Sequence, residues 1–177
     1  MITTLVIMLQ AAQVSPAPTP PPSPPPRCAS ERHAEFDFWV GKWAVYARSN
    51  PETKVADSKI ERLYNGCAVR ENWMPLRGAG GGSLNSLRDD GRWHQRWTGS
   101  SGETVDFVGG PDAAGQMVMT GWWANYGGPG QHRFVRMTYT LNDDGSVRQL
   151  GEISADHGAT FTTGYDLIYR PGDVTAE

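Results

Sequence analysis

Short runs of alternating apolar and polar residues cover most of the chain after residue 38. The clearest is 92–98, where Trp93, Gln95 and Trp97 share one face and basic side chains occupy the other. Because side chains alternate between the two faces of a strand, this period of two predicts β-structure. Ten strands are expected, over approximately 38–47, 57–64, 67–74, 83–88, 92–98, 103–108, 116–123, 132–141, 146–154 and 160–169.

Turn residues separate these runs at regular intervals, and no helical period competes with the alternation. The predicted turns contain residues that accept a positive φ, at Asn65-Gly66, Asp89-Asp90-Gly91, Gly109-Gly110-Pro111-Asp112, Asn142-Asp143-Asp144-Gly145 and Asp156-His157-Gly158. A meander of this kind must protect its two edge strands, and closure removes both edges. We therefore predict an all-β, antiparallel up-and-down barrel of about ten strands, after a short helical turn that starts at Ser30. A two-sheet sandwich is the alternative.

The first 27 residues do not show the alternating pattern. Residues 1–13 contain a short apolar run that suits a signal peptide and is too short to cross a bilayer. Residues 14–27 hold eight of the 13 prolines and are expected to form an extended linker. The barrel domain is expected over 28–171, with a tail at 172–177. We expect an exported protein, periplasmic or secreted, without stable membrane insertion.

The sequence contains two cysteines, Cys28 and Cys67. In an exported protein, an even number with one member at the start of the domain suggests a disulfide that pins the amino-terminal segment to the barrel. In a reducing compartment they would be two separate thiols. Neither belongs to a Cys-x-x-Cys pair, so they give no sign of a metal site.

Composition narrows the choice of partners. A net charge of -3 with scattered basic residues gives no electrostatic reason to expect nucleic acid binding. The four histidines stand apart from one another in the sequence, so no metal site or haem ligand is predicted, and no cofactor is expected. The sequence does not indicate an oligomeric state.

Alternation also identifies the inner face of the barrel. Val69, Glu71 and Trp73 share a face with Cys67, which places one carboxylate among apolar neighbours. A buried carboxylate needs a cation or several donors, or its pKa rises. Arg136 is a candidate cation, although the opposite face of its own strand is the more apolar one. The predicted ligand-binding residues are Glu71, Trp73, Trp93, Gln95, Trp97 and Arg136.

The first and last strands are expected to pair and close the barrel. Trp43 lies on the first strand, and Arg170 lies at the end of the last. We predict that the guanidinium of Arg170 lies across the indole of Trp43 and closes the barrel floor.

Several segments resemble a family of small exported bacterial β-barrel proteins of unknown function. They are Phe36-Asp37-Phe38-Trp39-x-Gly41-x-Trp43, Gly66-Cys67-Ala68-x-x-Glu71-Asn72-Trp73, Ser83-Leu84-Asn85, Trp93-His94-Gln95-x-Trp97 and Val147-Arg148-Gln149. More remotely, Gly41-x-Trp43 and the late Arg170 resemble the calycins, which include lipocalins. The resemblance implies a barrel and export but brings no reaction with it. A Thr-Asp-Tyr motif typical of lipocalins is missing.

Three functions remain open from the sequence. The first is non-catalytic binding of a small, partly apolar molecule, which the inward tryptophans with Glu71 and Gln95 favour. The second is an enzyme that uses Glu71 as a general acid or base. The third is a structural or interaction module with a filled core. Trp122 and Trp123 should point to opposite faces, and the glycine-rich loop around 78–82 should lie near the barrel mouth.

Overall fold

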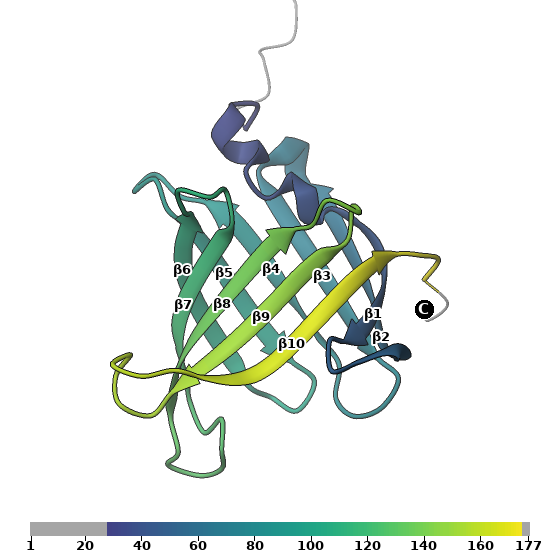
Figure 1. Ribbon diagram of the computed structural model, residues 1–177. Helices are drawn as coiled ribbons and strands as arrows, with labels where there is room; N and C mark the ends of the chain where they lie inside the picture. Colours follow the sequence, from purple (N-terminus) through teal and green to yellow (C-terminus); the bar gives the residue numbers. More distant parts are fainter. Residues whose placement is uncertain (1–27, 175–177) are drawn as a thin grey trace, which may run out of the picture.

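The computed structural model describes residues 28–174, which form one closed antiparallel β-barrel (Figure 1). Three 3-10 turns accompany the ten strands: η1 (Glu31–Ala34), η2 (Asp37–Trp39) and η3 (Tyr64–Gly66). The strands are β1 (Gly41–Ala47), β2 (Asn50–Leu63), β3 (Ala68–Pro75), β4 (Gly81–Leu87), β5 (Trp93–Gly99), β6 (Thr104–Pro111), β7 (Met117–Trp123), β8 (Arg133–Leu141), β9 (Val147–Ser154) and β10 (Thr162–Pro171). This confirms the predicted fold. The predicted signal peptide and linker lie outside the described residues.

Each strand pairs with its neighbour in sequence, and β1 pairs with β10 to close the barrel. In that seam Val45 lies opposite Tyr169, and both side chains are completely buried. Closure leaves no strand edge exposed within the ladder. The sandwich alternative is therefore wrong.

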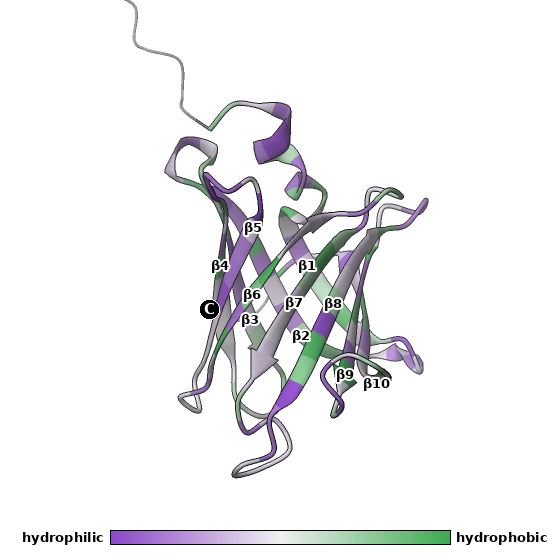
Figure 2. Cartoon of the chain, turned by 90° about the vertical axis from the view of Figure 1, so that its left-hand side faces the viewer, coloured by the Kyte–Doolittle hydropathy of each residue, from purple (hydrophilic) through white to green (hydrophobic). Residues whose placement is uncertain are grey.

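The two ends of the barrel differ. The 3-10 turns η1 and η2 lie across one end, and the opposite end carries the loops 76–80, 100–103, 124–132 and 155–161 (Figures 1 and 2). We call these the plugged end and the mouth. The glycine-rich loop around 78–82 lies at the mouth, as expected from the sequence, and its last two residues belong to β4.

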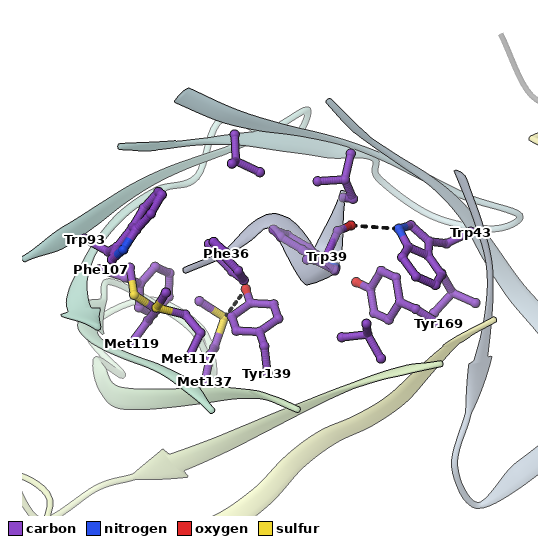
Figure 3. Packing of buried hydrophobic residues seen from close by; sticks show 14 of the residues in the cluster. Phe36, Trp39, Trp43, Trp93, Phe107, Met117, Met119, Met137, Tyr139 and Tyr169 are labelled. Atoms are coloured by element: carbon purple, nitrogen blue, oxygen red, sulfur yellow. Dashed lines mark hydrogen bonds between the residues drawn. The ribbon is translucent and has the colours of Figure 1, made fainter. Parts of the chain in front are cut away.

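Phe36 and Trp39 make the plug. Both side chains are fully buried, and their rings stack with centroids 5.0 Å apart inside the barrel (Figure 3). The indole of Trp43 donates a hydrogen bond of 2.9 Å to the carbonyl of Trp39, which fixes the turn to β1. The first strand therefore begins at Gly41 rather than at residue 38, because the Phe-Asp-Phe-Trp segment folds inward as a 3-10 turn instead of extending.

The prediction that Arg170 covers Trp43 is wrong. Trp43 points into the barrel and lies opposite Pro171, whereas Arg170 lies opposite Ala44 and points outward. Its guanidinium lies 4.6 Å from the ring centroid of Tyr46 and donates to the carbonyl of Pro51. A one-residue difference in register puts the two side chains on opposite faces of the sheet.

Cys28 and Cys67 form the predicted disulfide. Cys67 directly follows η3 at the plugged end, so the bond holds the start of the domain against the β2–β3 corner. The side chain of Arg62 also pairs with Asp37 of η2. Both contacts fasten the plug to the barrel wall. Within residues 28–174, no helix is long and apolar enough to cross a membrane.

Replacing both cysteines by serine should lower the free energy of unfolding by about 3 to 4 kcal/mol, because the bond closes a loop with a sequence separation of 39. Urea unfolding followed by tryptophan fluorescence measures this loss. Adding a reductant to the wild type should reproduce it. An unchanged unfolding midpoint in both cases would show that the plug holds without the bond.

Candidate functional site

A cavity of about 320 Å³ occupies the interior between the plug and the mouth. Its wall is mainly aromatic, with a few polar side chains. The residues that line it are Glu71, Trp73, Gln95, Trp97, Phe107, Trp123, Met137, Tyr139, Gln149, Tyr165, Leu167 and Tyr169. They come from seven strands, β3 and β5 to β10, so the closed ladder is what brings them together.

The cavity changes character with depth. Near the mouth, the rings of Trp73, Trp97 and Trp123 are partly exposed. Deeper in, Glu71 and Gln95 are almost completely buried. A molecule entering from the mouth would therefore pass the indoles first and meet the polar groups last.

Inward-facing glycines make room for several of these rings. A Cβ at Gly151 would lie 2.2 Å from the ring of Tyr165, and one at Gly81 would lie 2.7 Å from the ring of Trp97. Both glycines are in strands, where a missing side chain commonly marks a close approach of another group. The rings lie flat against the wall because the glycines leave that space.

A chain of hydrogen bonds ends on Glu71. The amide nitrogen of Gln95 donates to Oδ1 of Asn85 at 2.7 Å, and Nδ2 of Asn85 donates to Oγ of Ser83 at 3.1 Å. The hydroxyl of Ser83 then donates to Oε2 of Glu71 at 3.0 Å. Asn85 also donates to the carbonyl of Val69, at 2.9 Å. These buried polar groups are therefore satisfied by one another.

A second set of polar contacts lies across the cavity. The hydroxyl of Tyr169 donates to Gln149 at 2.6 Å, and the amide nitrogen of Gln149 donates to the hydroxyl of Tyr139 at 3.1 Å. Gln95 also donates to Tyr139, at 3.3 Å. Gln95 thus joins both sets of contacts, and the deep part of the cavity carries a continuous polar network.

Burial raises the pKa of Glu71 from its ordinary value of 4.5 to about 7. The hydrogen bond from the hydroxyl of Ser83 acts in the opposite direction by stabilising the carboxylate. Burial also raises the pKa of Tyr139, Tyr165 and Tyr169, so these hydroxyls remain protonated. Glu71 is consequently the group of the cavity wall that changes charge near neutral pH.

The structure brings four of the six predicted binding residues to the cavity: Glu71, Trp73, Gln95 and Trp97. Trp93 is also inside the barrel, but it packs beside the plug, where its indole donates to Glu35 at 2.9 Å (Figure 3). It does not line the cavity.

Arg136 points away from the cavity, so it cannot neutralise Glu71. Its side chain is 38% exposed, pairs with Glu152 at 2.9 Å and lies over the ring of Phe161. The neighbouring Val135 and Met137 point inward instead. The more apolar face of β8 is the inner one, and this was the signal in the sequence that placed Arg136 outside.

Several residues of the site were missed by the sequence argument. Ser83, Asn85 and Gln149 are polar but alternate in phase with apolar residues, which is the signal that could have found them. Tyr165 and Tyr169 of β10 also line the cavity. As predicted, Trp122 and Trp123 point to opposite faces, with Trp122 49% exposed and Trp123 lining the cavity.

Among residues 28–174, no group of three or more His, Cys, Asp or Glu side chains is placed to hold a metal ion. His157 packs against the ring of Trp122 on the outer surface. His94 lies on the outer face of β5 beside Asp90. The lining side chains carry one carboxyl, three phenols, two amides, three indole N–H groups and one thioether.

No protein-family model matches this chain, and no curated protein matches it significantly. The resemblance described from the sequence motifs stays a prediction.

Glu71 should make the stability of the fold depend on pH. The folded protein keeps this proton to a higher pH than the unfolded chain does, so the contribution is complete below about pH 4.5 and is lost as the pH rises to about 7. The loss should reach roughly 3 kcal/mol. Urea unfolding of the wild type and of Glu71→Gln across this range measures the difference between them.

Glu71→Gln should remove this part of the pH dependence, since glutamine cannot ionise but still offers an acceptor to Ser83. Glu52→Gln, which removes an exposed carboxylate, is the matched control and should retain it. Equal pH profiles for the wild type and Glu71→Gln would contradict the assignment of Glu71 as the titrating group.

Gly151→Ala should push the ring of Tyr165 into the cavity and destabilise the protein by about 1 to 3 kcal/mol, as overpacking does. Gly110→Ala is the control, because nothing lies within 4 Å of a Cβ at that position. Thermal unfolding of both variants gives the comparison. Equal melting temperatures would mean that the ring moves without cost.

Proposed function

We propose that this protein binds a small, partly apolar molecule in the barrel cavity. The observation that carries the proposal is the cavity of about 320 Å³, which has an aromatic wall and a polar network at depth. Small-molecule sites commonly combine an apolar lining with a few placed polar groups. The volume lies at the lower end of the usual range for such sites, which favours a compact ligand.

A solid barrel, the third of the sequence hypotheses, does not agree with this interior. The plug fills only one end, where Phe36 and Trp39 pack against Tyr139. Gly81 and Gly151 leave room at the wall for the rings of Trp97 and Tyr165. The glycines of these strands thus leave space for a ligand in the interior.

We further propose that the protein works outside the reducing cytoplasm, in the periplasm or as a secreted protein. The disulfide between Cys28 and Cys67 supports this, because such bonds persist mainly in oxidising compartments. The apolar run and proline-rich segment in the sequence before Cys28 are consistent with export.

Native mass spectrometry of the protein purified from its own host tests the binding proposal. The wild type should carry a small-molecule mass that denaturation releases. Trp123→Leu should retain much less of it, because Trp123 lines the cavity. Trp122→Leu is the matched control, since the indole of Trp122 is on the outer surface. No bound mass, together with no tryptophan fluorescence response to host extracts, would refute the proposal.

Acid–base catalysis at Glu71 is a second candidate. A pKa of about 7 is suited to a group that both accepts and donates a proton at neutral pH, and Glu71 lines the cavity. If a compound from host extracts is converted by the protein, Glu71→Gln should abolish turnover. Turnover that persists in this variant would exclude Glu71 as the catalytic acid or base.

A further inference from the structure

The cavity wall carries one carboxyl group and, among its lining residues, no cationic side chain. Glu71 is 5% exposed and lines the cavity, and no Arg, Lys or His is among the residues that form the cavity wall in the described part of the chain. The candidate cation, Arg136, is on the outer surface with its own carboxylate. Buried carboxylates are normally paired with a cation or remain protonated. The positive charge that would complete this site can come from a ligand.

The direction of the hydrogen bonds favours an ionised Glu71. The carbonyl of Val69 can only accept, so the group of Asn85 that faces it must be the amide nitrogen. That nitrogen also donates to Ser83, whose single hydroxyl proton is then left for Glu71. Each donor in this chain of hydrogen bonds therefore points toward the carboxyl. Such hydrogen bonds polarise and strengthen one another when the last acceptor is an anion.

The remainder of the wall is suited to a cation of low hydration. Seven of the lining residues are aromatic: Trp73, Trp97, Phe107, Trp123, Tyr139, Tyr165 and Tyr169. The face of an aromatic ring is negative and attracts a cation within about 6 Å, most strongly for tryptophan. Ring faces do not satisfy several N–H groups at once. An alkylated ammonium group, with few or no N–H donors, therefore fits this wall better than a primary amine does.

We propose that the cavity binds a small quaternary or tertiary alkylammonium compound, with its positive charge held by Glu71 and the surrounding aromatic rings. This inference rests on the proposed binding function and names the chemical class of its ligand.

Binding of such a cation should strengthen as the pH rises through neutrality. The titratable groups that line the cavity are Glu71 and the phenols of Tyr139, Tyr165 and Tyr169. Burial keeps these phenols protonated, so the change of charge is that of Glu71, whose pKa is about 7 without ligand. If only the ionised form binds, the affinity should fall about thirtyfold between pH 8 and pH 5.5.

Choline and its uncharged isostere, 3,3-dimethyl-1-butanol, make the decisive comparison, because they have nearly the same shape and differ in charge. Titration of the wild-type protein at pH 8, followed by calorimetry and by tryptophan fluorescence, should give at least about tenfold tighter binding of choline. Glu71→Gln should reduce this preference, because the aromatic rings alone then attract the cation. Glu152→Gln, which removes a carboxylate from the outer surface, should retain it.

The isostere comparison uses the wild type alone, so it remains decisive if Glu71→Gln does not fold. Equal or tighter binding of 3,3-dimethyl-1-butanol would overturn the alkylammonium proposal but support a cavity for neutral molecules. Binding of neither compound would also overturn it. In that case, the mass of a ligand retained from the host would decide separately whether the cavity binds a small molecule.

Discussion

The pairing of β1 with β10 is the constraint on which the cavity depends. These strands begin and end the barrel, and their ladder joins residues 120 or more positions apart, such as Val45 and Tyr169. Without this seam the inner faces of the strands would not surround a common volume. Glu71 would then be open to water, and the burial that raises its pKa would be lost. The chemistry of the site is thus a consequence of closure.

Within the closed barrel, a backbone carbonyl sets the direction of the hydrogen bonds between the polar side chains. The carbonyl of Val69 orients Asn85, and this orientation determines which atoms Gln95 and Ser83 present. A hydrogen bond to the main chain is hard to reverse, because the carbonyl has no proton to give. The direction of the hydrogen bonds that end on Glu71 is therefore set by the main chain.

The sequence was sufficient for the number of strands and their order, because alternation and turn residues are local signals. It did not give every boundary: β2 begins at Asn50 rather than at residue 57, and Gly109-Gly110-Pro111, predicted as a turn, belongs to β6. The disulfide followed from the number and position of the cysteines. The sequence was also sufficient for the inward direction of Glu71, Gln95 and Trp97, which follows from the same period of two. What it could not give was distance across the barrel. Trp93 and Trp97 share a face but lie at different depths, so Trp93 packs beside the plug and Trp97 lines the cavity. Arg136 is different, because the more apolar face of its strand already indicated that its side chain points outward.

The plug shows a second limit of local reasoning. Phe36 and Trp39 are three residues apart, and their aromatic neighbours resemble the start of a strand. They fold as a 3-10 turn because the open end of the barrel offers Tyr139 and Tyr169 as packing partners. Those partners are at least 100 residues away in the chain, and a tertiary contact of that kind overrides local preference. The same turn explains why no arginine is needed to close the floor.

The number of strands also fixes how the molecule can be attached to anything else. An even count of antiparallel strands returns the chain to the side from which it started, so Gly41 and Pro171 both lie at the plugged end (Figure 1). Cys28 is held at that end too, by its bond to Cys67. Whatever is joined to either side of the barrel domain, in the cell or on a sensor surface, leaves the mouth facing away from the attachment. The even number of strands therefore places both ends of the barrel domain opposite the mouth.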